Sequence, residues 1–123
     1  MKAILLDTNF ILTCVKQKVD FFEFLEFEGF KILIPKQVIN EIESFSESGK
    51  KFHFKKDAEL ALKILKENNF KKIDIKEKNV DRGIIRFAAE NPKIVIATLD
   101  REIKKTVKNQ KLVVRGNKEL EIL

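Results

Sequence analysis

The chain has 123 residues, a length that fits one hydrophobic core, so we expect residues 1–123 to form a single domain. Apolar residues make up 44% of it and charged residues 36%, which predicts a globular protein with a densely charged surface. The net charge of +6 favours polyanionic partners. No apolar run is as long as a membrane span, and the apolar start stops at Asp7, too early for a signal peptide. We therefore expect a cytoplasmic protein without membrane contact.

Short apolar runs alternate with longer amphipathic stretches along the chain. The runs predict strands at residues 3–6, 31–34, 94–97 and 112–114, with a weaker strand at 73–75. The intervening stretches predict helices at residues 9–16, 20–28, 36–45, 56–68, 80–90 and 101–108. Alternation of this kind favours crossover connections and a parallel sheet covered on both faces. The expected fold is an α/β, three-layer α/β/α sandwich with a mostly parallel sheet of four to five strands.

Two aspartates directly follow predicted strands. Asp7 comes after the first apolar run, and Asp100 follows the apolar run that begins at Ile94. Ligands of open parallel sheets bind outside the carboxyl ends of the strands, near the point where the strand order reverses. These two carboxylates could therefore converge on a site. Either residue could instead cap the helix that follows it, which is the commoner role of an aspartate there.

Two further acids lie on predicted helices. Glu41 borders the apolar face that Val38, Ile42 and Phe45 form, although a solvated position on the helix is the simpler alternative. Asp81 stands at the start of helix 80–90, where a negative charge suits the helix dipole and where capping is again the alternative. Each acid alone is weak evidence, and their joint arrangement is what gives them weight.

The segments around these acids resemble, in order, the four motifs of the PIN-domain nucleases. Leu-Leu-Asp-Thr-Asn at residues 5–9 resembles the first motif, and residues 34–42 resemble the second. Residues 81–84 are similar to the third, and residues 96–103 to the fourth, in the form of the archaeal and eukaryotic ribosomal-RNA-processing members. The resemblance runs from residue 4 to about residue 115. It implies a PIN-like fold.

Two positions depart from the family pattern. Arg82 follows Asp81, where the processing-type members often carry a second aspartate, and its presence removes a candidate metal contact. Leu99 stands where Asn is frequent. Neither departure replaces one of the four main acids, but both bear on the geometry of the site.

The resemblance implies a metal-dependent endoribonuclease that cuts RNA, either in RNA processing or as a VapC-type toxin restrained by an antitoxin. Phosphodiester hydrolysis needs an activated water and relief of charge on the phosphate, both of which divalent ions supply. Carboxylates suit Mg²⁺ or Mn²⁺, whereas the lone His53 and the lone Cys14 cannot form the zinc site of a multi-thiolate protein. The expected catalytic residues and metal ligands are Asp7, Glu41, Asp81 and Asp100, with Asn9 and Thr98 contacting these ligands or the phosphate.

Basic residues suggest where RNA would bind. A stripe along the predicted helix 101–108 is formed by Arg101, Lys104, Lys105 and Lys108. A predicted loop at residues 49–56 interleaves bases with aromatic residues, a composition that suits stacking on single-stranded nucleic acid. A solvated lysine face, and aromatic packing at a helix start, would explain the same residues without RNA.

Other interpretations stay open. A catalytically inactive PIN-like protein could bind RNA without cutting it, as Arg82 and Leu99 would allow. A phosphatase would need a second aspartate where the chain has Asn9, and a receiver domain would need paired acids where the first strand offers only Asp7. Apolar residues nearly surround helix 20–28, so it is either buried in the core or covered by a partner, such as a second copy in a homodimer.

Overall fold

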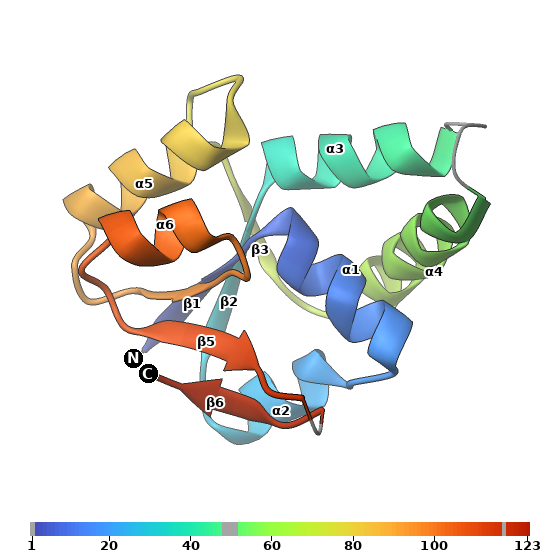
Figure 1. Cartoon of the computed structure of the whole chain (residues 1–123), viewed down its shortest axis with the longest axis horizontal. Helices are drawn as coiled ribbons and strands as arrows, with labels where there is room; N and C mark the ends of the chain where they lie inside the picture. Colours follow the sequence, from blue (N-terminus) through green and yellow to red (C-terminus); the bar gives the residue numbers. More distant parts are fainter. Residues whose placement is uncertain (1, 48–51, 117) are drawn as a thin grey trace.

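The computed structural model describes residues 2–47, 52–116 and 118–123, and these form a sheet with helices on both faces (Figure 1). The strand order is β3-β2-β1-β4-β5-β6. All neighbouring strands pair in parallel except β6, which is antiparallel to β5. The strands are β1 (Ala3–Leu6), β2 (Lys31–Pro35), β3 (Lys71–Ile73), β4 (Val95–Ala97), β5 (Lys111–Val114) and β6 (Leu120–Ile122).

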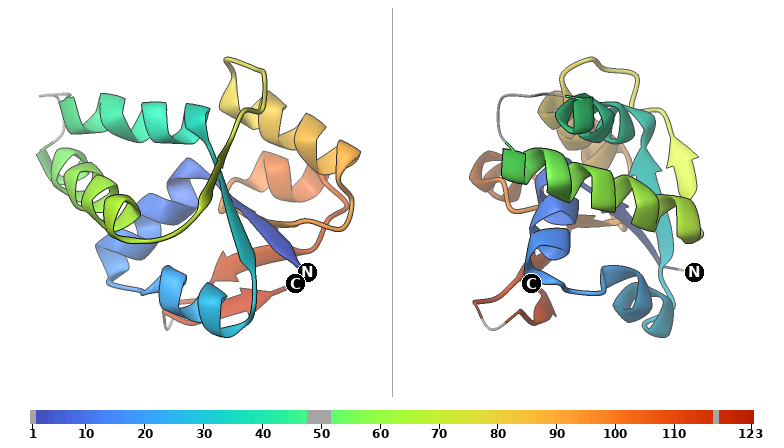
Figure 2. Two further views of the ribbon diagram at one scale, coloured as in Figure 1. Left: turned by 180° about the vertical axis from the view of Figure 1, so that it is seen from behind. Right: turned by 90° about the vertical axis from the view of Figure 1, so that its right-hand side faces the viewer.

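The helices divide into two layers. In the left-hand view of Figure 2, α1, α3 and α4 lie on one side of the central strands, and α5 and α6 lie on the other. Helix α2 packs near β2. The helices are α1 (Thr8–Gln17), α2 (Phe21–Phe27), α3 (Lys36–Glu47), α4 (Phe52–Glu67), α5 (Val80–Glu90) and α6 (Arg101–Thr106). This arrangement confirms the predicted three-layer sandwich.

The core explains why the strand signals were continuous apolar runs. Ile4 and Leu6 of β1 pack into the layer of α1 to α4, while Leu5 between them packs into the layer of α5 and α6. In β4, Ala97 packs into the layer of α1 to α4, and Ile96 packs into the layer of α5 and α6. Because successive side chains of a strand point to opposite faces, a strand that is covered on both faces must be apolar at every position.

Short polar side chains determine where several helices begin. Four helices have an aspartate or asparagine as the N-cap, and its side chain accepts a hydrogen bond from a backbone N–H of the first turn. Asp7 directly follows β1, and Asp100 comes three residues after the end of the adjacent strand β4, so two of these caps lie close to the carboxyl ends of strands. The N-caps are Asp7, Asp20, Asn79 and Asp100.

The sheet differs from the prediction in two respects. It has six strands instead of four or five, because Leu120–Ile122 pairs antiparallel with β5; this strand is too short to give a clear apolar run. The predicted weak strand at 73–75 is also wrong in position, since β3 ends at Ile73. Ile75 is nevertheless buried, because it packs beside α5 after leaving the sheet.

The helix boundaries correct two further predictions. Residues 52–56 belong to α4, so the predicted RNA-binding loop is wrong there, and its residues 49–51 lie outside the described part of the chain. Helix α6 ends at Thr106 and does not reach Lys108. On α2, Phe21, Phe22 and Leu25 are buried in the core, which is one of the two alternatives considered for this helix. The other alternative was a face covered by a partner.

The strand order reverses between β1 and β4, which is the place where open parallel sheets bind ligands. The backbone N–H of Asp7 donates to the carbonyl of Ala97 at 3.0 Å, so the carboxyl ends of these two strands lie side by side. Within the described residues, no helix is both long and apolar enough to span a membrane.

A stability prediction follows from the packing of α5. A Cβ atom at Gly83 would lie 2.5 Å from Cδ1 and 2.8 Å from Cγ1 of the buried Ile75. We expect Gly83→Val to lower the free energy of unfolding in urea by about 2 kcal/mol through overpacking. Ala89→Val, at an exposed position of the same helix, is the control and should cost less than about 1 kcal/mol. Equal losses of unfolding free energy in the two variants would contradict the close approach of Gly83 to Ile75.

A candidate active site at the carboxyl ends of β1 and β4

Asp7 is a buried carboxylate at the centre of the site. Only 3% of this residue is exposed. Its Oδ1 accepts a hydrogen bond from the Thr8 N–H at 2.7 Å, and its Oδ2 accepts one from the Thr98 hydroxyl at 2.8 Å. The first bond is the predicted cap of α1, but the second reaches a different strand end. Capping therefore accounts for only one of the two carboxylate oxygens.

Thr98 joins the two aspartates that follow β1 and β4. Its hydroxyl is fully buried, donates to Asp7 and accepts a hydrogen bond from the Asp100 N–H at 3.1 Å. Asp100 in turn accepts from the Ile103 N–H through Oδ1 at 3.0 Å, which makes it the cap of α6. Its Oδ2 has no hydrogen-bond partner among the described residues. The two aspartates are thus held in one fixed arrangement, with one oxygen of Asp100 unused.

Glu41 and Asp81 bring two more carboxylates to this region from α3 and α5. Neither side chain has a hydrogen-bond or ion-pair partner among the residues that the structure describes. The capping alternative for Asp81 is wrong, because the Asn79 side chain accepts the hydrogen bond from the Arg82 N–H and caps α5. Asp81 lies in the first turn of α5, where its charge suits the helix dipole.

The electrostatics show that the four acids share one region. Burial raises the pKa of Asp7 to about 6, against the lowering effect of its two hydrogen bonds, and repulsion from Asp81 and Glu41 adds to the rise. Burial also raises the pKa of Asp81, and repulsion from Asp100 and Glu41 contributes to that rise. The four acids that the sequence singled out therefore lie near enough for their charges to interact.

The chemistry of these groups fits a hard divalent cation. All four are carboxylates, the ligands that Mg²⁺ and Mn²⁺ prefer, and the mutual repulsion of the acids is what a bound cation would relieve. Within the described residues, no three His, Cys, Asp or Glu side chains already stand in the arrangement of a bound metal. Side-chain rotation of the unpaired Glu41 and Asp81 would be needed to close the ligand set.

The remaining predicted site residues take different positions. Asn9 is exposed on the first turn of α1, and its side chain has no hydrogen-bond partner among the described residues, while Arg82 is exposed beside Asp81. On α6, Arg101 and Lys105 are exposed and Lys104 is half-buried.

The predicted basic stripe along residues 101–108 is wrong at its C-terminal end. Lys108 lies beyond the last residue of α6, so it cannot continue a helical stripe from Arg101. The six residues of α6 span roughly 9 Å, which takes the chain away from Asp100 before Lys108 is reached. The stripe on α6 is therefore limited to Arg101, Lys104 and Lys105.

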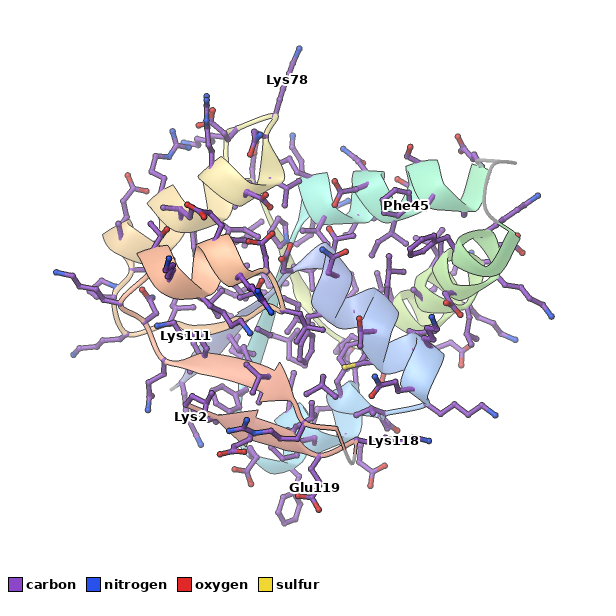
Figure 3. The ribbon with its side chains drawn as sticks, viewed as in Figure 1. Lys2, Phe45, Lys78, Lys111, Lys118 and Glu119 are labelled. Atoms are coloured by element: carbon purple, nitrogen blue, oxygen red, sulfur yellow. The ribbon has the colours of Figure 1, made fainter. Side chains whose placement is uncertain are left out.

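Sequence reasoning missed three polar residues next to the acids. Gln37 and Asp74 hydrogen-bond to each other, and Arg86 binds the segment that leads into α5. Lys78, which projects from this segment in Figure 3, marks its place on the surface. The position of Gln37, one helical turn before Glu41, was a usable signal, whereas nothing in the sequence indicated a role for Arg86.

Known proteins resemble this chain over nearly its whole length. Residues 4–116 match the model of a family described as a PIN like domain. Ribonuclease VapC4 of Methanocaldococcus jannaschii is 30% identical over 128 residues, which cover 99% of this chain and 97% of that protein.

Two solved structures share the fold. The PIN domain endonuclease Utp24 is 24% identical with a TM-score of 0.78, over 98% of this chain and 90% of its own. The second is VapBC2 from Rickettsia felis, bound to a DNA fragment from its promoter. It is 17% identical with a TM-score of 0.53, over 90% of this chain and 98% of its own. At these identities, the likeness is evidence for the fold alone.

The buried carboxylate of Asp7 predicts an unusual dependence of stability on pH. A pKa raised from 3.8 to about 6 means that the folded state holds the proton more tightly than the unfolded state. Asp7 should therefore stabilise the fold below about pH 4, and this contribution should be lost as the pH rises through 6, at a cost of up to about 3 kcal/mol. In EDTA, urea unfolding at pH 4.5 and 7.5 should show a smaller loss in Asp7→Asn than in the wild type.

The control for this measurement is Asp57→Asn, on α4, which is not among the groups that shift the pKa of Asp7. It should keep the wild-type difference in stability between the two pH values. A wild-type difference that persists in Asp7→Asn would show that the pH dependence comes from other groups.

Proposed function

Because the chain belongs to the PIN-like domain family, we propose that it is a divalent-metal-dependent endoribonuclease that hydrolyses RNA phosphodiester bonds, with residues 1–123 as one nuclease domain. The observation that carries the proposal is the buried Thr98 hydroxyl, which ties the Asp7 carboxylate to the backbone of Asp100. Glu41 and Asp81 complete a group of four carboxylates at the reversal of the strand order. A purely structural pair of helix caps would not need two further unpaired acids beside it.

In this proposal, Mg²⁺ or Mn²⁺ binds to Asp7, Glu41, Asp81 and Asp100. Such a cation lowers the pKa of water and offsets charge on the phosphate and the leaving oxygen. Thr98 keeps the Asp7 carboxylate in a fixed orientation, and the α1 and α6 caps fix the backbones on which Asp7 and Asp100 stand. In the same proposal, the exposed Asn9, two residues after Asp7, contacts the phosphate of the substrate.

The biological role that we propose has two forms. The first form is the role of a toxin that an antitoxin restrains. It is supported by the resemblance to a protein named ribonuclease VapC4, which is matched over 97% of its length. The fold shared with Utp24, described as a PIN domain endonuclease, is compatible with a role in RNA processing. RNA is the substrate in both forms, and the net charge of +6 favours its binding.

The metal assignment predicts a change in thermal stability. Mn²⁺ or Mg²⁺ should raise the melting temperature of the wild-type protein, because a ligand that binds only the folded state stabilises it by mass action. Asp7→Asn should abolish this rise, while the Asp57→Asn control should keep it. Differential scanning calorimetry with and without Mn²⁺ would measure both effects.

Cleavage provides the second measurement. With a mixed RNA pool and mapping of the product ends, the wild type should cut only when a divalent ion is present. Asp7→Asn and Asp100→Asn should reduce the rate by about 10³-fold or more, and Glu41→Gln by less if Glu41 mainly orients water. A wild-type protein without a melting shift and without metal-dependent cleavage would instead be a PIN-like protein that binds RNA and does not cut it.

RNA binding by the start of α6 predicts a change in salt dependence. In EDTA, replacing Arg101 and Lys104 with Ala should weaken the binding of unrelated RNAs alike, and should reduce the salt slope by about 0.7 for each lost phosphate contact. Lys108→Ala is the comparison, and its slope should stay near that of the wild type. If Lys108→Ala reduced the slope as much, RNA would extend along the whole segment that the sequence predicted.

A further inference from the structure

The segment between β3 and α5 is bound by a side chain that the proposed chemistry does not use. Gln37, in the first turn of α3, donates from Nε2 to Oδ1 of Asp74 at 2.6 Å. Its Oε1 accepts a hydrogen bond from the Ile75 N–H at 3.3 Å. One amide group therefore binds two consecutive residues of this segment, with both of its polar atoms in use.

The same segment is bound from the other side by α5. Nη2 of Arg86 donates to the carbonyl of Ile75 at 2.6 Å and to that of Lys76 at 3.4 Å. Nη1 of Arg86 lies 3.5 Å from the Glu77 carboxylate. Ile75 thus bonds to α3 through its N–H and to α5 through its carbonyl. We call this connection, Gln37–Ile75–Arg86, the bracket.

The two helices that the bracket joins each carry one of the unpaired acids. Gln37 stands four residues before Glu41 and so lies on the same side of α3. Asp81 is in the first turn of α5, on the helix that Arg86 anchors. The starts of α3 and α5 approach each other in Figure 1.

Other contacts between these two helices are few. α3 packs mainly against α4, and α5 packs against α6. Glu41 and Asp81 repel each other, as the effect of Glu41 on the pKa of Asp81 shows. A connection between the two helix starts is therefore what opposes their separation.

We propose that Gln37 is a positioning residue of the site, and that its amide sets the spacing of Glu41 and Asp81 on which the affinity for a divalent cation depends. This inference rests on the proposed function, because the spacing matters only if these acids hold the cation. Without the amide, the Ile75 N–H loses one long hydrogen bond, at 3.3 Å, so the cost to the fold is small. The exposed ion pair between Lys36 and Asp74, at 3.2 Å, would still join α3 to this segment, but an exposed pair holds two elements only weakly. The start of α5 can then shift relative to α3, and residues that orient metal ligands commonly affect affinity 10- to 100-fold.

The test is Mn²⁺ binding by the full chain without RNA, measured from the electron paramagnetic resonance signal of free Mn²⁺. Gln37→Leu should raise the dissociation constant for Mn²⁺ about tenfold. Its cleavage rate should approach that of the wild type at saturating Mn²⁺, since the ligands themselves are intact. The melting temperature in EDTA should change by no more than a few degrees.

Two controls accompany this test. Gln110→Leu makes the same change at an exposed position whose side chain has no hydrogen-bond partner among the described residues, and it should leave the affinity for Mn²⁺ unchanged. Amide hydrogen exchange in EDTA should be faster at Ile75 in Gln37→Leu than in the wild type. This second measurement reports the hydrogen bond itself and does not involve the metal.

The outcomes separate the two proposals. Equal Mn²⁺ affinity in the wild type and Gln37→Leu would overturn the positioning role and leave the metal assignment intact. A weaker affinity together with a melting temperature lowered by ten degrees or more would also overturn it, because the effect would then be one of folding. If the wild type itself did not bind Mn²⁺, the proposed function would fail and the positioning role would fail with it.

Discussion

The arrangement of the site depends on one buried hydrogen bond, between the Thr98 hydroxyl and the Asp7 carboxylate. A carboxylate that loses nearly all contact with water is costly unless its oxygens are bonded, and Asp7 satisfies both of its oxygens within the adjacent ends of β1 and β4. Thr98 can make this bond only because the two strands are neighbours in register. The same hydroxyl also accepts from the Asp100 N–H, so the sheet pairing and the geometry of the acids are fixed together.

The strand order determines which elements can reach these two aspartates. With β1 and β4 at the reversal point, the connection after β2 begins on one side of Asp7, and α5 and α6 lie on the other. Glu41 therefore reaches the site from α3, and Asp81 from α5, although forty residues separate them in the sequence. The acids come from four different elements. No pair of them is connected by a short loop, so their spacing depends on tertiary contacts such as the bracket.

The sequence predicted the fold well where the signal was periodic. Strands that are buried on both faces, such as β1 and β4, are continuous apolar runs, and their abrupt ends marked Asp7 and Asp100. Leu120–Ile122 was missed because a three-residue strand at an edge carries a polar residue at its centre. The extent of α6 was wrong because Ile103 and Val107, both buried, stand four residues apart, and this apolar spacing imitates a further helical turn although the helix ends at Thr106.

The site was predictable as a set of acids but not as a geometry. A motif pattern can name Glu41 and Asp81, yet it cannot show that Asn79 caps α5 and leaves Asp81 unpaired. The spacing of Gln37 from Glu41 indicated its side of α3 but not its partner, and Arg86 had no signal at all, because both side chains bind the backbone of Ile75, whose N–H and carbonyl have no signature in the sequence.

The charge distribution links the cation to the substrate. The protein as a whole carries a net charge of +6, which attracts a polyanion, but the four acids at the strand ends would repel the phosphate at the point where it must bind. A divalent cation held by these acids would offset part of their negative charge and give the phosphate oxygens a positive ion to bind. Occupancy by the cation would thus act twice, first by offsetting the cost of burial and the mutual repulsion that raise the pKa of Asp7 and Asp81, and then by admitting the phosphate. For this reason, the residues that hold the acids at their spacing would influence the binding of the scissile phosphate without contacting it.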